Sequence, residues 1–413
     1  MTAFRCRTRW AAPALVSAHW TSTGCQPIVP VRAMDLEGRF NIALHDADAD
    51  AAERRFLETA GVFVPELGQL SSMIHGDLDE RASGILWWRE HVDAQRSVLI
   101  SDHLVCAVDA IQTNLAEGSL HLSEAENYWT GVDRKHARII EADGRRTWPQ
   151  ASNVAELLPE KLAVLHTAGF FRAVGSVIDC LAAASIGVAA VSDNLLRADF
   201  ERLRRWLNRE IKPTTSRHAI HDGLRVCVDD GIGAAGPVGW LRWASDYRNM
   251  FVHRGRRTEL VKVELEARIL DAQGRYIPKA NSVRLLLRDP AASEIQGLTE
   301  FRKTQLTLTE PAERTMRALL ESTKYLTQTI ARHLCGVWSR RRSEPDLLKQ
   351  PLEQWPELDS ASVGFEGYEP GTTNLAATHI VGHPSLGQRI RAAGLSSDHN
   401  EGSPDAQKKR IGH

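Results

Sequence analysis

The sequence predicts a mainly α-helical protein in which a helical bundle carries an inserted β-hairpin. Apolar residues recur at helical spacing in four segments from residue 160 onward, while one stretch before the last of them alternates apolar and charged residues. The 413 residues, 43% hydrophobic and 25% charged, suffice for a globular protein with a sizeable core. We therefore expect a bundle, a mixed α/β region before it and disordered ends.

The four helical segments differ in how much of their surface is apolar, and hence in how far we expect neighbouring helices to bury them. Residues 160–191 are rich in alanine and apolar nearly all round toward their end, which is typical of a helix buried within a bundle. A helix over 195–211 begins after a Ser-Asp-Asn sequence that can cap it. Helices over 238–253 and 311–340 complete the set, and the last carries one apolar stripe.

The β segment interrupts the helical part of the chain. Residues 259–288 alternate apolar and charged side chains, and Gly274 marks a turn, so we expect a hairpin with one wet face. The predicted regions are a disordered segment over 1–33, a mixed α/β region of unassigned role over 34–159, a bundle with the insertion over 160–340, and an extension over 341–413 that is disordered after about 385.

Composition favours a cytoplasmic protein. The six cysteines are scattered without a C-x-x-C pair or zinc-ligand spacing, which is typical of free thiols. The most apolar segment, Leu181 to Val191, is shorter than the ~20 residues that a membrane span needs, so no span is expected. The formal net charge of −1 excludes a global basic field, yet it allows a local basic patch.

The predicted helix over 238–253 carries the most informative pattern. Its apolar face is formed by Trp240, Trp243, Ala244, Tyr247 and Phe251. The opposite face is polar and carries Arg242, Ser245, Asp246, Asn249 and His253. Asn249 and His253 are one helical turn apart, and Arg248 lies beside them at the boundary between the two faces.

The hexapeptide Arg248-Asn249-Met250-Phe251-Val252-His253 resembles the mark of HEPN domains, which is Arg, a polar residue that is often Asn, three further residues and His. Looser Arg-to-His spacings at Arg39 and Arg96 carry no weight, because such a pattern is common. The resemblance implies a bundle of about four helices over 160–340, from which the inserted hairpin departs. It also implies metal-independent RNA cleavage, without a cofactor, at a cleft between two protomers.

Each residue of the motif has a role that such a reaction needs. His253 titrates near neutrality and suits proton transfer from the attacking 2′-hydroxyl. Arg248 offers a fork of donors for phosphate oxygens, and Asn249 can orient the imidazole or hold one such oxygen. Ser245 and Asp246 would support the site from the same face. The arginines that follow the helix would steer the RNA backbone, namely Arg254, Arg256 and Arg257.

Plainer interpretations of the same residues stay open. His253 can complement the dipole at a helix C-terminus, Arg248 can pair with a carboxylate on a neighbouring helix, and the three later arginines can form a solvated turn. Several HEPN relatives also bind partners without cleaving RNA. The alternative hypothesis is therefore a non-catalytic helical module for protein or RNA binding.

Other constellations are weaker. Gly231-Ile232-Gly233-Ala234-Ala235-Gly236 spells a dinucleotide-binding pattern after a strand-like segment, but neighbouring charges and Pro237 oppose it, so we favour a flexible loop. His218 and His221 could hold a metal if helical, whereas Pro213 and Gly223 favour a surface loop. No metal site is expected. A dinucleotide-using enzyme remains the third hypothesis.

The leading hypothesis is a cytoplasmic endoribonuclease that needs no metal and acts on RNA as a homodimer. The resemblance further implies a role in stress or phage defence, as a toxin under a regulatory protein partner. No membrane association is expected from the sequence.

Overall fold

The computed structural model describes most of the helical part of the chain. It covers residues 51–52, 54–77, 94–143, 154–209, 217–253, 260–270, 276–288 and 307–344. The chain divides into two units, residues 1–47 and 48–413, and all described residues belong to the second. The predicted disorder over 1–33 and after about 385 lies outside the described residues. Most described residues are helical, so the prediction of a mainly α protein is confirmed.

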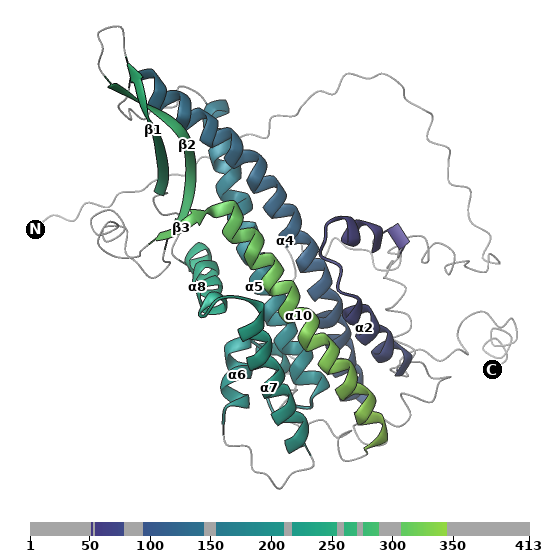
Figure 1. Cartoon of the computed structure of the whole chain (residues 1–413). Helices are drawn as coiled ribbons and strands as arrows, with labels where there is room; N and C mark the ends of the chain where they lie inside the picture. Colours follow the sequence, from purple (N-terminus) through teal and green to yellow (C-terminus); the bar gives the residue numbers. More distant parts are fainter. Residues whose placement is uncertain are drawn as a thin grey trace, which may run out of the picture. The chain divides into compact units, whose positions relative to one another are not determined.

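Three long helices form the centre of the described structure. Helix α4 (Ala94–Asp143) and α5 (Val154–Val188) pack along one another, and α10 (Ala312–Ser343) lies against both (Figure 1). Helix α2 (Pro65–Asp77) packs on α4 and α10. The described part of region 34–159 therefore shares one core with the bundle, and the predicted limit at residue 160 falls within α5.

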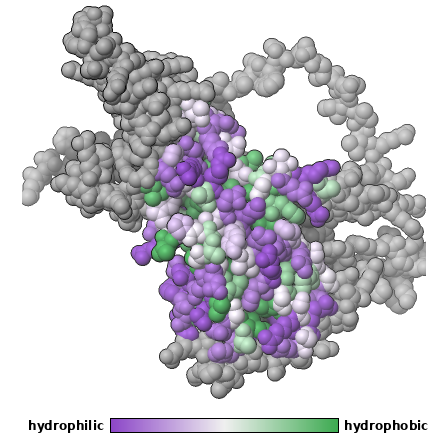
Figure 2. Space-filling model, in the orientation of Figure 1, coloured by the Kyte–Doolittle hydropathy of each residue, from purple (hydrophilic) through white to green (hydrophobic). Residues whose placement is uncertain are grey.

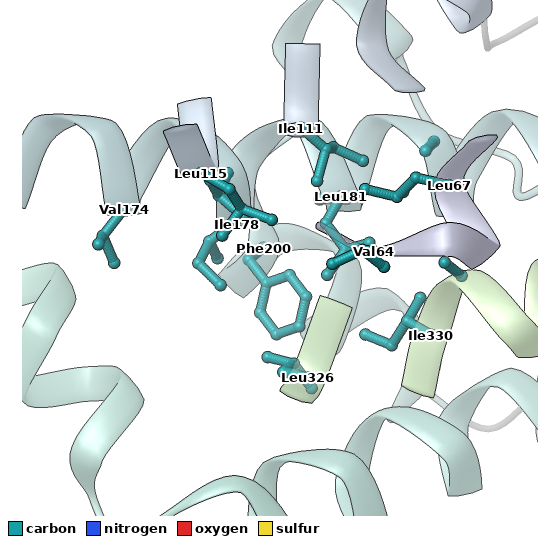
Figure 3. Close-up of a cluster of buried hydrophobic side chains, with 14 of the residues drawn as sticks. Val64, Leu67, Ile111, Leu115, Val174, Ile178, Leu181, Phe200, Leu326 and Ile330 are labelled. Atoms are coloured by element: carbon teal, nitrogen blue, oxygen red, sulfur yellow. The ribbon is translucent and has the colours of Figure 1, made fainter. Parts of the chain in front are cut away.

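Shorter helices cover α5 and α10 on another side. Helix α6 (Phe200–Leu207) packs on α5, α7 (His218–Ala235) on α10, and α8 (Trp240–His253) on α5. Apolar side chains from α2, α4, α5, α6 and α10 meet in one cluster, part of which Figure 3 shows. Phe200 brings α6 into this cluster, beside Ile178 of α5 and Leu326 of α10 (Figure 3).

Helix α5 owes its composition to this enclosure. By length and composition its stretch Leu158–Val188 could cross a membrane, and 72% of the apolar window is buried inside the protein. Phe170, Val177 and Leu181 are fully buried, as they must be in a helix that neighbours cover on several sides. Packing within the protein thus accounts for the apolar sequence, and the predicted absence of a membrane span stays a prediction.

The predicted helix over 195–211 is shorter than expected. A 3₁₀ turn over Leu195–Arg197 comes first, and α6 begins only at Phe200. Two caps explain the break: the Asn194 side chain accepts the Leu196 N–H at 2.9 Å, and Asp199 Oδ1 accepts the Arg202 N–H at 2.7 Å. Asp199 thus begins a new helix instead of continuing the first.

Helix α7 contradicts two of the loop interpretations. The flexible loop expected over 231–236 and the surface loop expected around His218 and His221 are, except for Gly236, parts of one helix. Ile220, Leu224 and Val228 are buried at helical spacing against the core. A Cβ at Gly231 would lie 3.0 Å from Leu326 Cδ1, so this glycine permits close packing on α10. The strand-like segment expected before these glycines is also helical, so Gly231 and Gly233 do not form the turn between strand and helix that a dinucleotide-binding motif requires.

The β segment lies near one end of α4 (Figure 1). Strand β1 (Leu260–Leu270) pairs antiparallel with β2 (Tyr276–Arg288), with register shifts after Glu264 and Ala267. The other edge of β2 pairs with β3 (Thr307–Pro311), which leads directly into α10. Leu287 of β2 is buried, so the sheet contributes to the core.

A buried arginine joins α10 to the end of α5. Arg341 is 1% exposed, and its Nη1 donates to the carbonyls of Gly187 and Val188 at 3.0 Å each. Burial lowers the pKa of Arg341 to about 9, and the charge of Arg217 acts in the same direction. The guanidinium lies 5.3 Å from the Trp338 ring, and the Trp338 indole in turn donates to Asp77 of α2 at 2.7 Å. One turn of α10 therefore ties α5 and α2 together.

Replacing Arg341 tests this tie. We expect Arg341→Met to lower the free energy of unfolding by about 2–3 kcal/mol, because two carbonyls at the end of α5 lose a charged donor. The measurement is urea-induced unfolding followed by circular dichroism. Arg340→Ala is the control, since Arg340 is exposed and its pair with Glu344 is also exposed. Equal stability of wild type and Arg341→Met would contradict the tie.

Three partly or fully buried histidines make stability depend on pH. Burial lowers the pKa of His103, His221 and His333 below the ordinary value of 6.5. The unfolded chain then binds more protons in acid, so we expect the free energy of unfolding to fall as the pH drops below about 6.5. His221→Gln should make this fall shallower, by at most about 1.4 kcal/mol per pH unit. Unfolding curves at pH 5, 6 and 7 measure the slope, and an unchanged slope would contradict the assignment to His221.

Candidate functional site

The aromatic face of α8 packs as the sequence predicts. Phe171 of α5 stacks on Tyr247 with the ring centroids 4.5 Å apart, and it contacts Trp243 and Phe251 with centroids at 5.9 Å each. At the start of α8 the Trp240 indole donates to the carbonyl of Ile232 at 3.0 Å. These contacts fix the rotation of the helix about its axis, and they determine where its polar residues lie.

Arg248 reaches across to α5. Its Nη2 lies 3.1 Å from Oδ2 of Asp179, and the two side chains are 34% and 31% exposed. The arginine passes over Gly175, where a Cβ would stand 2.6 Å from Arg248 Cδ and 2.8 Å from its Nε. A glycine one turn before Asp179 thus leaves the space that the arginine occupies. The plainer interpretation of Arg248, a pair with a carboxylate on a neighbouring helix, describes this contact.

Asp179 was not singled out by the sequence reasoning. Burial raises the pKa of its carboxyl, and the charge of Asp199 raises it further, while Arg248 and the Phe200 backbone N–H oppose the shift. A carboxyl with a raised pKa beside an arginine in a pocket is a candidate for proton transfer. The sequence held one signal for it, because Asp179 is the only charged residue between Arg172 and Asp193.

The two residues belong to a pocket of about 330 Å³ between α5, α6 and α8. Helix α8 contributes Ser245, Arg248 and Asn249, which the sequence had grouped, and the structure brings them to one place. Asp199 and Glu201 come from the start of α6. The remaining lining is apolar and consists of Val174, Gly175, Ile178, Phe200, Leu241 and Ala244.

The other predicted site residues do not line this pocket. Asp246 lies 3.8 Å from the guanidinium of Arg242 on the exposed side of α8. His253 is the last residue of the helix, and its side chain lies outside the described residues. Arg254, Arg256 and Arg257 also lie outside them.

The charge of the pocket is dominated by carboxylates. Among the described lining residues there are three carboxylates, Asp179, Asp199 and Glu201, and one arginine, so the lining is net negative when all are ionised. The raised pKa of Asp179 reduces this excess by favouring its neutral form. Arg248 also has five N–H donors, of which Asp179 occupies only part, so donors remain for a bound anion.

The histidines of α7 do not form a metal site. Nε2 of His221 lies 2.9 Å from the carbonyl of Ala189, and its ring is buried. Across the described parts of the chain, no group of three or more His, Cys, Asp or Glu side chains could hold a metal ion. His221 is therefore engaged in packing, although both histidines are helical as a metal pair would require.

Comparison with known proteins does not identify a family or a function for this chain. No protein-family model, no curated protein and no solved structure gives a significant match. The HEPN resemblance accordingly stays a prediction that rests on the six-residue motif.

Adding one methyl group to α5 tests the arrangement around Arg248. We expect Gly175→Ala to push the Arg248 side chain off Asp179, because the added Cβ overlaps its Cδ and Nε. A double-mutant cycle with Arg248→Ala and Asp179→Ala measures the pair, worth about 0.5–1 kcal/mol at this exposure. The coupling should vanish in Gly175→Ala and persist in Gly336→Ala, where nothing lies within 4 Å. Persistence in both would contradict the close approach.

Proposed function

We propose that this protein is a metal-independent endoribonuclease of the HEPN type, with Arg248, Asn249 and His253 as its reactive residues. The supporting observation is the position of Arg248, which is held by Asp179 in a pocket that also receives Asn249. Both lie on the helix that ends at His253. Arg248 and Asn249, which are adjacent in the motif, therefore line the same cavity.

The arrangement of helices is compatible with this proposal. Helices α5, α7, α8 and α10, with the short α6, supply the number of helices that an HEPN bundle needs. We place this bundle over the helices from α5 to α10 and treat β1 and β2 as a hairpin inserted before the last helix. The packing of α8 on α5 supports it, since it directs the motif toward a pocket.

The chemistry is an attack of the RNA 2′-hydroxyl on the adjacent phosphorus. The bond from the 2′-oxygen to phosphorus forms as the bond to the 5′-oxygen breaks, leaving a 2′,3′-cyclic phosphate and a 5′-hydroxyl. His253 takes the proton from the 2′-hydroxyl and gives it to the leaving 5′-oxygen, Arg248 stabilises the charge on the phosphate oxygens, and Asn249 holds one of them. Asp179 is a positioning residue that orients the guanidinium.

The proposal includes an assembly and a setting. A homodimer would bring two copies of the motif to one cleft, which concentrates positive charge on the RNA. We further propose action in the cytoplasm, in stress or phage defence, under a regulatory protein partner.

Cleavage of RNA in EDTA tests the proposal. We expect the wild-type protein to cut total or transfer RNA, and His253→Ala and Arg248→Ala to cut at least about 100-fold more slowly, the usual contribution of one acid–base group. The control is His218→Ala, because His218 lines neither this pocket nor its wall. The products should end in cyclic phosphate. Equal cutting by all four proteins would show that the site is elsewhere.

The excess of carboxylates favours a second candidate, a non-catalytic helical binding module. Asp199 and Glu201 would repel a phosphate that approaches Arg248. If the folded wild-type dimer leaves RNA intact and still binds it with an affinity that Arg248→Ala changes, this candidate replaces the nuclease.

A further inference from the structure

A second pocket, of about 470 Å³, lies beside α6. It is formed by the segment after α5, by α6 from Arg202 onward and by Arg209 just after that helix. Its lining residues are Ser192, Asp193, Asn194, Arg202, Arg205, Trp206 and Arg209, and none of them lines the Arg248 pocket. The surface around α6 and α7 is largely hydrophilic in the view of Figure 2. None of these arginines belongs to the HEPN-like motif.

One acid–base pair builds the wall of this pocket. The Asp193 side chain is 9% exposed and accepts from Nε of Arg202 at 2.8 and 2.6 Å, and also from Nη2. Asp193 Oδ1 accepts the Asn194 N–H at 2.8 Å as well. This hydrogen bonding raises the pKa of Arg202, which therefore stays charged. Asp193, the one carboxylate among the described lining residues, is thus engaged by Arg202 and by the Asn194 N–H.

Two further guanidinium groups keep their charge available. Among the described residues, no carboxylate lies within ion-pairing distance of Arg205 or Arg209. Arg205 makes one long hydrogen bond, from its Nε to the carbonyl of Glu201 at 3.4 Å, and Glu201 pairs instead with Arg204. Among the described residues the charges of Arg205 and Arg209 are therefore not compensated by an ion pair, which is an anion-binding property.

An aromatic ring stands beside these charges and is held in place from behind. Trp206 contacts the buried His221 edge to face, with ring centroids 4.8 Å apart and an interplanar angle of 87°. His221 is itself fixed by the carbonyl of Ala189. A positioned indole next to arginines is the combination with which proteins bind single-stranded nucleic acid, because bases stack on the ring and phosphates meet the guanidinium groups.

We propose that this pocket binds a nucleotide of single-stranded RNA, with a base at Trp206 and the flanking phosphates at Arg205 and Arg209. The indole favours RNA over an acidic peptide, which offers nothing to stack. A cavity of this size falls within the range of small-molecule sites, about 300–1,000 Å³. The choice of RNA as ligand rests on the proposed function, whereas binding does not require cleavage.

The two pockets are lined by different residues of one short helix. Asp199, Phe200 and Glu201 at the start of α6 line the Arg248 pocket, and Arg202, Arg205 and Trp206 line the second. The eight residues of α6 span about 12 Å at 1.5 Å per residue. A strand of a few nucleotides reaches both. Phosphates held at the basic end would bring RNA to Arg248 despite the carboxylates there.

Binding of a fluorescent 12-nucleotide RNA, followed by anisotropy in EDTA, tests the proposal. We expect the double variant Arg205→Gln with Arg209→Gln to raise Kd at least about 10-fold at 0.1 M salt. The slope of log K against log salt should shrink by about 1.4, since each phosphate contact with a single strand contributes about 0.7. The matched control is Arg314→Gln with Arg317→Gln, which removes two exposed charges from α10 outside both pockets. Thermal unfolding of each variant shows that it is folded.

The outcomes separate this inference from the nuclease. Binding that depends on Arg205 and Arg209 without any cleavage supports the pocket and overturns the nuclease. Cleavage of RNA whose binding does not change when Arg205 and Arg209 are replaced supports the nuclease and overturns the pocket. Equal displacement of the RNA by polyglutamate would assign the pocket to acidic peptides and overturn the proposal, as would the absence of RNA binding by the wild-type protein.

Discussion

The enclosure of α5 is the constraint on which the rest of the structure depends. A helix this apolar is stable in water only when neighbours cover it, and α4, α6, α8 and α10 do so. Its last carbonyls also need donors once they are buried, and Arg341 supplies them from α10 at Gly187 and Val188. Burial disfavours the charged form of Arg341 and lowers its pKa. The interactions with the two carbonyls and the Trp338 ring must therefore outweigh the free-energy cost of removing the charge from water.

The candidate site is built from the same central helix. Asp179 interrupts the apolar sequence of α5 at the place where α8 crosses it, and Gly175 leaves room for the arginine that comes from there. Because α5 is held on several sides, the carboxylate sits on a rigid element, as a functional site requires. The stacking of Tyr247 on Phe171 plays the same part for α8. The pair between the two helices is thus positioned by packing at both ends.

Helix α6 separates the acidic surroundings of Arg248 from a basic pocket. A helix N-terminus favours carboxylates, and α6 has Asp199 as its N-cap and Glu201 in its first turn. Its last turn carries Arg204 and Arg205, which a helix C-terminus favours. The tertiary structure adds a cavity beside each set of charges.

The sequence by itself determined the mainly helical class, the limits of α8 and α10 within a few residues, and the aromatic face that Phe171 covers. These follow from the spacing of apolar residues, which is local. Only the tertiary structure decided that the glycines of 231–236 belong almost entirely to a helix, because the space that Gly231 leaves is filled by Leu326, far along the chain. It also decided that Arg248 meets Asp179 and that Trp206 packs against His221 of α7. Such contacts join distant segments, and residue spacing within one segment cannot specify them.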